Sequence, residues 1–382
     1  MKIGIITYHC AHNYGAVLQA YALQCYLQEA GHSVTVVNYR PDFLVQPYTL
    51  FRWSWPVGVS VLQCCRRVAG VVWYGFRFLP SRWLRRWRFE HFISGQLNLS
   101  PQVRRPEEVT ALGFDALVFG SDQIWNIGNS DGPDPFYFGA FPDFSGVKIA
   151  YAASADGGEE AMLHHADCLE YIRDYASISA RERSLATALH AVVGREVDTV
   201  VDPTLLLEPT QWEALATDPG RRRYVLVYEV LPCSFIVELA EHIARELGLS
   251  VVIMRKDIAP HGRPGQSIDC AAPKEFLGWV QNADYVVTSS FHGTVFSVLN
   301  RKPFVCALSG LPAENRMLGL LEELGMAGRR CYDAHPPDDY SYAVDYAPAT
   351  ERIVDLRRKS RDFLRHACAR LTVHAKPSGS RL

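Results

Sequence analysis

Hydrophobic residues near the N-terminus change from a strand-like run to a helix-like repeat and back again. Residues 2–8 are mostly apolar and predict a buried strand, and residues 16–30 repeat apolar positions at helical spacing before Gly31. Residues 33–37 predict a second strand. This order is a βαβ unit, which opens a parallel sheet whose ligands bind at the carboxyl ends of the strands. The loop that contains Asn13 lies at such an end.

The same alternation continues along most of the chain. Further strands are predicted at residues 115–119, 147–153 and 177–179, and a second series at 197–201, 224–228, 250–254, 285–288 and 303–306. Helices are predicted from residue 184, over 235–247 and 273–281, from about residue 294, and over 351–371. We therefore expect an α/β protein with two Rossmann-like domains at 1–185 and 186–345, followed by a C-terminal helix and tail at 346–382.

Length and composition agree with two domains and narrow the class of protein. The 382 residues exceed the roughly 250–300 at which one hydrophobic core stops growing, and 48% of them are apolar. A formal net charge of -2 gives no reason to expect nucleic acid as a partner. The ten cysteines are scattered and predict reduced thiols, and the N-terminus does not resemble a signal peptide. We expect a cytoplasmic protein without a membrane span.

Residues 51–105 depart from this alternation. They hold five of the eight tryptophans and ten arginines, with Glu90 as the single acidic residue. We interpret residues 45–105 as a basic, Trp/Arg-rich helical insertion in the first domain. Such a segment either binds an anionic membrane surface peripherally, where indoles lie at the interface, or packs on its own domain with a solvated basic face.

The segment Ser289-Ser290-Phe291-His292-Gly293 lies between a predicted strand and the next helix. A helix N-terminus carries unpaired N–H groups and about half a positive charge, so it binds phosphate or carboxylate. Serine hydroxyls add donors, Gly293 permits a close approach of the backbone, and His292 supplies a charge or a proton. A structural histidine is the alternative.

Polar residues at three other predicted strand ends are weaker candidates. Arg181 has a planar guanidinium that suits a carboxylate or phosphate, although the residues alone favour a salt bridge with Glu182 or a neighbour. Asn13, Asp122 and Gln123 could recognise or deprotonate sugar hydroxyls, although these residue types are also common in turns and caps.

Seven short blocks resemble the polysaccharide pyruvyltransferase family, in family order over about residues 1–330. The blocks are Met1 to His9 with Asn13-Tyr14-Gly15-Ala16-Val17-Leu18-Gln19, Asn38-Tyr39-Arg40-Pro41, Gly120-Ser-Asp-Gln-Ile-Trp-Asn126, Tyr151-Ala-Ala-Ser154, Ser179-Ala-Arg-Glu182, Asp202-Pro-Thr-Leu-Leu206, and residues 282–293. The match is poorest in the Trp/Arg-rich region. The resemblance implies a fold similar to GT-B glycosyltransferases, with the acceptor on the first domain and the donor on the second.

The resemblance also implies a reaction and its residues. Family members move pyruvate from phosphoenolpyruvate (PEP) onto a sugar as a cyclic ketal, so PEP is expected as donor substrate, without a cofactor or metal. By position, Arg181 and His292 carry over as donor and catalytic residues. Together with the residue chemistry above, this predicts a PEP site at Arg181, Ser290, Phe291, His292 and Gly293. It also predicts acceptor contacts at Asn13, Tyr14, Asp122 and Gln123, with Asp122 as a candidate base.

Two other functions fit the same sequence. One is a GT-B glycosyltransferase that uses a nucleotide sugar, although neither a GxGxxG nor a Walker A motif is present. The other is a non-catalytic family member in a polysaccharide assembly complex. For the acceptor, the Trp/Arg-rich segment favours a lipid-linked oligosaccharide at the inner face of a membrane, and a two-fold homo-oligomer is the usual expectation for assembly.

Overall fold

The computed structural model describes residues 1–49, 61–130, 132–141, 143–256, 267–268, 270–335 and 344–374, with the side chains of 61–77 and 370–374 left out. Trp53 and Trp55, which belong to the predicted insertion, therefore lie outside the described residues.

The first part of the chain builds a parallel sheet of seven strands in the order β3-β2-β1-β4-β5-β6-β7. Its strands are β1 (Lys2–Ile6), β2 (Ser33–Tyr39), β3 (Leu99–Val103), β4 (Ala116–Phe119), β5 (Val147–Ala153), β6 (Ser177–Ala180) and β7 (Asp198–Thr199). Every neighbouring pair is parallel, from β2 with β3 to β6 with β7. The central strands β1 and β4 are almost entirely buried, as their unbroken apolar sequences predict.

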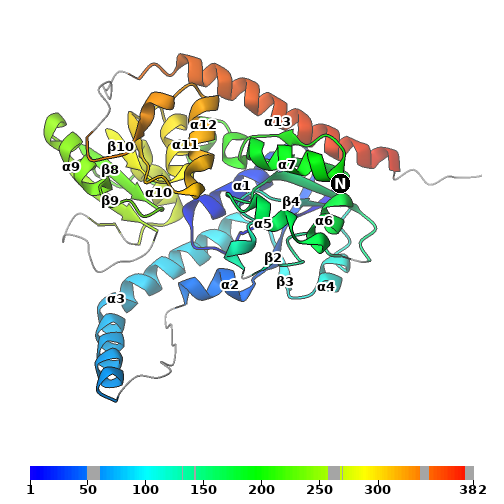
Figure 1. Ribbon diagram of the computed structural model, residues 1–382, viewed down its shortest axis with the longest axis horizontal. Coiled ribbons are helices and arrows are strands. Elements are labelled where there is room, and N and C mark those ends of the chain that lie inside the picture. Colours follow the sequence, from blue (N-terminus) through cyan, green and yellow to red (C-terminus); the bar gives the residue numbers. More distant parts are fainter. Residues whose placement is uncertain are drawn as a thin grey trace, which may run out of the picture.

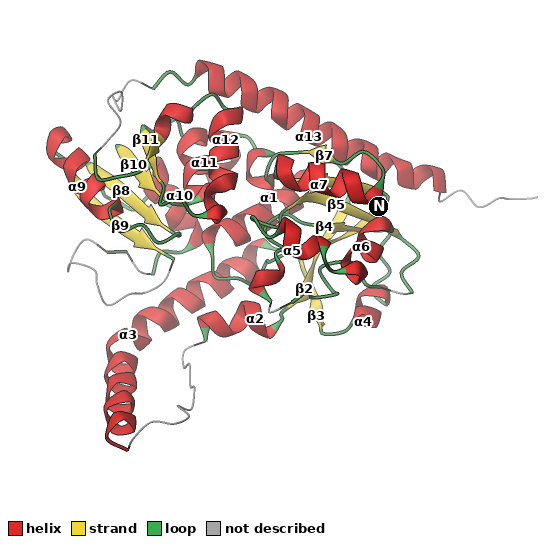
Figure 2. Ribbon diagram, viewed as in Figure 1, coloured by secondary structure: helices red, strands yellow, loops and turns green. Residues whose placement is uncertain are grey.

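The second part builds a smaller sheet of five strands in the order β12-β11-β10-β8-β9. Its strands are β8 (Tyr224–Glu229), β9 (Ser250–Arg255), β10 (Tyr285–Thr288), β11 (Phe304–Ala307) and β12 (Arg330–Cys331), again all parallel. The predicted α/β class with two Rossmann-like sheets is therefore confirmed, and the two sheets stand side by side in Figure 2.

Helices cover both sheets, as parallel strands require. Around the larger sheet lie α1 (Tyr14–Glu29), α4 (Pro106–Thr110), α5 (Glu159–Leu163), α6 (Ala166–Arg173) and α7 (Arg183–Val193). With the smaller sheet lie α8 (Pro209–Leu215), α9 (Ile236–Leu247), α10 (Pro273–Gln281), α11 (Phe291–Leu299) and α12 (Asn315–Glu323). The long α13 (Ala347–His374) returns along both parts of the molecule (Figure 1).

The structure changes one detail of the predicted order. The strand predicted at 197–201 to open the second series is instead β7, which pairs with β6 at the edge of the first sheet. The last predicted helix is α13, and it packs on the first part of the chain, where the hydroxyl oxygen of Ser360 accepts from the N–H of Val201 and Tyr26 donates to the carbonyl of Arg361. The exact domain boundary at residue 185 stays a prediction.

The Trp/Arg-rich insertion follows α2 (Asp42–Val45) and contains the 36-residue α3 (Val61–Gln96). Residues 99–103, predicted as part of this helical insertion, instead form β3 at the edge of the first sheet. α3 bends on its way out from the body of the molecule, and Pro80 within it removes one backbone donor (Figure 1). Its C-terminal half packs against the second part of the chain, where Arg88 donates to Glu275 and to the carbonyl of Cys270. Among the described helices, none has a stretch long and apolar enough for a bilayer span.

Aromatic packing joins the two parts of the chain into one core. Tyr14 at the start of α1 stacks on Phe276 of α10, with ring centroids 4.6 Å apart and planes 8° from parallel. Phe89 of α3 and Tyr228 of β8 lie against the same tyrosine. Residues of both strand series therefore share one apolar core cluster.

Replacing Phe276 by Ala should test this shared core. Phe276 is completely buried, so the variant should lose about 3–5 kcal/mol of unfolding free energy from lost burial and cavity formation. Guanidinium denaturation would measure it. Tyr332→Ala removes a ring that is 59% exposed and should change stability by less than about 0.5 kcal/mol. Equal losses in both variants would contradict the assigned packing.

Candidate functional site

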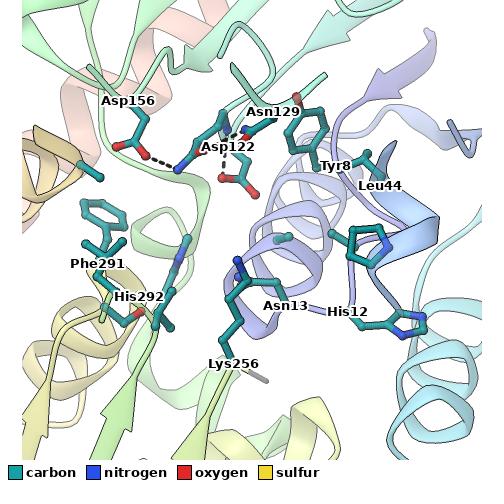
Figure 3. Close-up of a pocket in the computed structure, with 18 of the residues that line it drawn as sticks. Tyr8, His12, Asn13, Leu44, Asp122, Asn129, Asp156, Lys256, Phe291 and His292 are labelled. Atoms are coloured by element: carbon teal, nitrogen blue, oxygen red, sulfur yellow. Dashed lines mark hydrogen bonds between the residues drawn. The ribbon is translucent and has the colours of Figure 1, made fainter. Parts of the chain in front are cut away.

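A cleft of about 770 Å³ opens where the carboxyl ends of the two sheets face each other. Its lining includes residues of the loops after β1, β4, β5, β8, β9 and β10, and of α2, α3, α11 and α12. The predicted residues in it are Asn13, Asp122, Gln123, Ser290, Phe291 and His292, and it also contains His12, Arg82, Arg85, Arg86, Asp156, Lys256 and Arg316. In Figure 3, Phe291 and His292 face Asp122 and Asn129 across this space.

The Ser-Phe-His-Gly segment begins α11, as predicted from the sequence. Ser290 is the N-cap, and its hydroxyl oxygen accepts a hydrogen bond from the N–H of Gly293 at 3.3 Å. The first N–H groups of a helix have no partner within it, so the start of α11 presents donors to the cleft.

Gly293 is needed for packing and does not line the cleft. A Cβ atom at this position would lie 2.2 Å from Oγ1 of Thr288 and 2.9 Å from Cδ1 of Tyr228. The absence of a side chain at Gly293 therefore lets α11 pack closely on strands β10 and β8. The predicted close approach of this glycine to a ligand is not what the structure shows.

His292 is held between the two parts of the chain. Its Nε2 atom lies 3.5 Å from Oδ2 of Asp202, which follows β7. On its other side the ring covers Gly15, where a Cβ atom would be only 2.0 Å from Nδ1. Because glycine alone leaves this space, Gly15 allows the imidazole to rest on the N-terminus of α1.

Asp202 is the buried anchor of this arrangement, with 1% of its surface exposed. Its Oδ1 accepts from the N–H and the hydroxyl of Thr204, and its Oδ2 accepts from Arg181 at 2.9 Å. Burial alone would raise the pKa of this carboxyl, but His292, Arg181 and the Thr204 N–H hold it well below its usual range. Asp202 is therefore an anion that faces His292.

Arg181 is fully engaged by the protein and is not among the residues that line the cleft. Its guanidinium donates to Asp202, to the hydroxyl of Ser154 at 2.9 Å, and to Glu182 at 3.2 Å. Burial alone would lower its pKa, but the carboxylates of Glu182 and Asp202 raise it. The guanidinium lies 4.8 Å from the ring centre of Phe291, which does line the cleft. Arg181 therefore forms salt bridges with Glu182 and Asp202, as the structural alternative predicts.

A second arginine, Arg316 of α12, reaches the cleft. Its Nε atom contacts Oδ1 of Asp156, and both side chains are almost buried. Its guanidinium lies 5.8 Å from the ring centre of Phe291, so this ring contacts both Arg181 and Arg316. Burial lowers the pKa of Arg316. A buried guanidinium in a cleft is well suited to an anionic ligand.

Asp122, Gln123 and Asp156 form one polar network on the first-sheet side. Gln123 donates its side-chain N–H to Asp156 and accepts at Oε1 from Asn129 at 3.0 Å, while Asp122 accepts from the N–H of Gln123 at 2.9 Å (Figure 3). Asp122 and Asp156 both have left-handed backbones, with φ of 70° and 52°. Such outliers in non-glycine residues are typical of functional sites.

Of the predicted acceptor residues, Tyr14 lies outside the cleft. It is buried, and its hydroxyl donates to the carbonyl of Ala271 at 2.8 Å. Its position therefore does not fit the predicted acceptor contact. Asn13 does line the cleft, but its side-chain oxygen caps α1 by accepting from the N–H of Gly15.

Within the part of the chain that the structure describes, no three His, Cys, Asp or Glu side chains gather as metal ligands. Each cysteine with a described side chain is a free thiol. The expectation of a metal-free, cofactor-free reaction remains a prediction.

A family model for polysaccharide pyruvyl transferases matches residues 13–309. The chain belongs to this family. The match includes the loops with Asn13, Asp122, Arg181 and His292, and it ends before Arg316. The cleft is therefore that of a member of the pyruvyl transferase family.

Solved structures also resemble this pyruvyl transferase family member at low identity. They include the UDP-GlcNAc 2-epimerase from Methanocaldococcus jannaschii (10% identity, 94% of each chain, TM-score 0.45) and a putative UDP-N-acetylglucosamine 2-epimerase from Listeria monocytogenes (10%, 96% of this chain and 91% of that one, 0.49). Arabidopsis thaliana UGT89C1 complexed with UDP-L-rhamnose is another (13%, 97% and 98%, 0.48). No curated protein matched the chain. At these TM-scores, no argument about activity rests on the likeness.

Sequence reasoning missed the residues that tertiary contacts bring to the cleft. Asp202 and Ser154 lie in blocks that resemble the family, so the blocks pointed to their loops without assigning a role. Arg316 and Asp156 lie in no such block, and only the fold pairs them.

The ionisation of Asp156 should be visible in stability. Burial raises the pKa of its carboxyl to about 6. Between about pH 4 and pH 6 the folded state therefore keeps a proton that the unfolded chain has released, and this contribution to the unfolding free energy falls as the pH rises.

Asp156→Asn removes that contribution. Relative to the wild type, the variant should gain about 2–3 kcal/mol of unfolding free energy between pH 4 and pH 6.5. Urea denaturation across this range would measure it. The attraction of Arg316 is already part of this pKa, so it adds no separate pH dependence. Parallel pH profiles for the two proteins would contradict the raised pKa.

Proposed function

We propose that the chain transfers the pyruvyl group of PEP to a sugar as a cyclic ketal and releases phosphate. The observation that carries this proposal is His292 at the start of α11, held between Asp202 and Gly15, with the buried Arg316 in the same cleft. A small donor with two anionic groups suits a cleft that offers a helix N-terminus and a guanidinium close to one aromatic ring.

For the donor, we propose that Arg316 and the Ser290–His292 end of α11 contact its carboxylate and phosphate. The guanidinium fork matches either group, and Ser290 contributes a hydroxyl. Phe291 contacts the guanidinium of Arg181, which is already hydrogen-bonded to Asp202, Ser154 and Glu182. Arg181 is then a positioning residue that acts through Asp202 and Phe291, and its predicted direct contact with PEP is replaced by that of Arg316.

The chemistry needs an acid, a base and no redox step. A proton is added to the vinyl carbon of PEP, one sugar hydroxyl attacks the adjacent carbon, the bond from that carbon to the phosphate oxygen breaks, and a second hydroxyl closes the ketal. The acceptor loses two hydroxyl protons. One of them makes up for the proton that was added to the vinyl carbon, and the other leaves with phosphate or passes to solvent. His292 serves as the general acid or as a charged donor to the departing phosphate.

Asp202 supports His292 in either role. Because its carboxylate faces Nε2, it orients the imidazole so that Nδ1 lies over the N-terminus of α1. On the acceptor side, Asp122 is the proposed base, and Asn13 and Gln123 contact the sugar hydroxyls. The acceptor is a lipid-linked glycan at the inner face of a membrane, which is consistent with the Trp/Arg-rich α3 beside the cleft.

Loss of the imidazole should remove the chemistry while the fold remains. His292→Ala should lower PEP-dependent turnover about 10²–10⁴-fold, the usual contribution of a positioned acid or base. Phosphate release and the ketal carbon from ¹³C-labelled PEP, followed by NMR with candidate glycans, would measure it. Near-normal turnover would exclude His292 from the reaction.

Gly15→Ala tests the position of that ring without touching it chemically. The added Cβ would need the space that Nδ1 occupies, so turnover should fall at least about tenfold. Gly95→Ala in α3 is the matched control, because its Cβ would meet nothing within 4 Å. Equal activity in both glycine variants would contradict the assigned contact.

Replacing Arg316 should affect the kinetics, whereas replacing Arg181 should affect the stability. Arg316→Ala should raise the KM for PEP about 10–100-fold, the worth of a hydrogen bond to a charged group. Arg181→Ala leaves the Asp202 carboxylate buried without its partner and should cost about 3–5 kcal/mol of unfolding free energy. Initial rates at varied PEP concentration and thermal melts distinguish the two. An unchanged KM in Arg316→Ala would assign the donor contact elsewhere.

A further inference from the structure

The C-terminal half of α3 presents two different chemistries on its two faces. Toward the cleft it turns Arg82, Arg85 and Arg86. Away from the cleft, Trp83 and Trp87 are 54% and 51% exposed. Because residues four apart lie on the same face of a helix, the two indoles form one surface.

This pair of tryptophans stands out among the described residues. The other exposed large hydrophobic side chains of the described residues are Leu311, Tyr332 and Val354, which lie at three separate places along the chain. Trp87 also stacks on His91, with ring centroids 5.4 Å apart. Two neighbouring exposed indoles are the side chains that settle at the boundary between lipid headgroups and acyl chains.

The same face lacks negative charge. From residue 80 to 95, its exposed positions are Pro80, Trp83, Trp87, His91, Ser94 and Gly95. The acidic residue of this stretch, Glu90, is turned toward the first domain, where it accepts from Arg40 and lies 3.0 Å from His12. An anionic surface would therefore meet no repulsion from a carboxylate on this face.

The α3 edge of the cleft carries more positive charge than a small donor such as PEP needs for binding. Arg82, Arg86 and Lys256 line it, together with Arg85, whose guanidinium donates to the carbonyl of Arg255. The two acidic residues of the lining, Asp122 and Asp156, belong to the first-sheet side, where Asp156 contacts Arg316. This edge suits a second phosphate-rich group.

We infer that the Trp83 and Trp87 face of α3 docks on an anionic lipid bilayer, and that Arg82 and Arg86 on the adjacent, cleft-lining side receive the diphosphate of a lipid-linked acceptor. α3 thereby places the cleft at the membrane surface, beside its projecting N-terminal half (Figure 1). The diphosphate part of this inference rests on the proposed function, because it names the acceptor of the same cleft. The bilayer part stands on the indoles alone.

Vesicle sedimentation tests the bilayer contact. The full chain should pellet with phosphatidylcholine vesicles that contain phosphatidylglycerol, and high salt should weaken this binding. Trp83→Ser with Trp87→Ser should weaken it at least about tenfold, since the apolar area of two indoles no longer leaves water. Tyr332→Ser removes an equally exposed ring elsewhere and should bind as the wild type does.

Three outcomes would overturn the bilayer contact: no pelleting of the wild type, wild-type binding by the double variant, or a dimer in light scattering that only the tryptophan variant loses. The last would assign this face to a second copy of the chain.

A ligand-induced melting shift tests the diphosphate site. In saturating PEP, farnesyl diphosphate and inorganic diphosphate should each raise the melting temperature further, and Arg86→Gln should lose this second shift while it keeps the shift caused by PEP. Inorganic phosphate should add little. A second shift that survives in Arg86→Gln would remove the arginine site. If PEP itself gives no shift while the vesicles bind, the proposed reaction fails and the bilayer contact stands.

Discussion

A carboxylate that is 99% removed from solvent must find strong partners, and Asp202 finds them in both parts of the molecule. It accepts from Arg181 and Thr204 of the first part and faces His292 of the second. An unpaired charge at this position would cost several kcal/mol, and Arg181 and Thr204 keep it paired. The carboxylate lies 3.5 Å from Nε2 of His292, so this buried group is also where the two parts meet beside the cleft.

The cleft divides its tasks between its walls. The α11 and α12 wall offers a helix N-terminus, an imidazole and a buried guanidinium, all of which suit anions. The opposite wall offers carboxylates and amides, which suit hydroxyl groups. Phe291 contacts both arginines, of which Arg316 lines the cleft while Arg181 holds Asp202. This division is what a transfer from an anionic donor to a sugar requires.

Local pattern was enough to predict the two parallel sheets and the helix that His292 begins. The apolar runs of β1, β4 and β10 fit fully buried strands, and Ser290 is a typical N-cap before the helix. The strand at β7 was placed in the wrong sheet because a short strand carries no information about its neighbour. Position within a motif could not reveal which arginine lines the cleft, since Arg181 is turned to Ser154 and Asp202, far apart in the sequence, while Arg316 lines the cleft beside Asp156. Arg316 and Asp156 have no local signal, because each is explained only by the other.

The most direct test of this account is the melting temperature of the purified protein with PEP, compared with UDP-sugars, GDP-sugars and inorganic phosphate. A ligand that binds the folded state stabilises it by mass action. The account predicts that PEP gives a shift larger than phosphate gives, and that nucleotide sugars give none. Stabilisation by nucleotide sugars in place of PEP would contradict it and would identify the cleft as that of a glycosyltransferase.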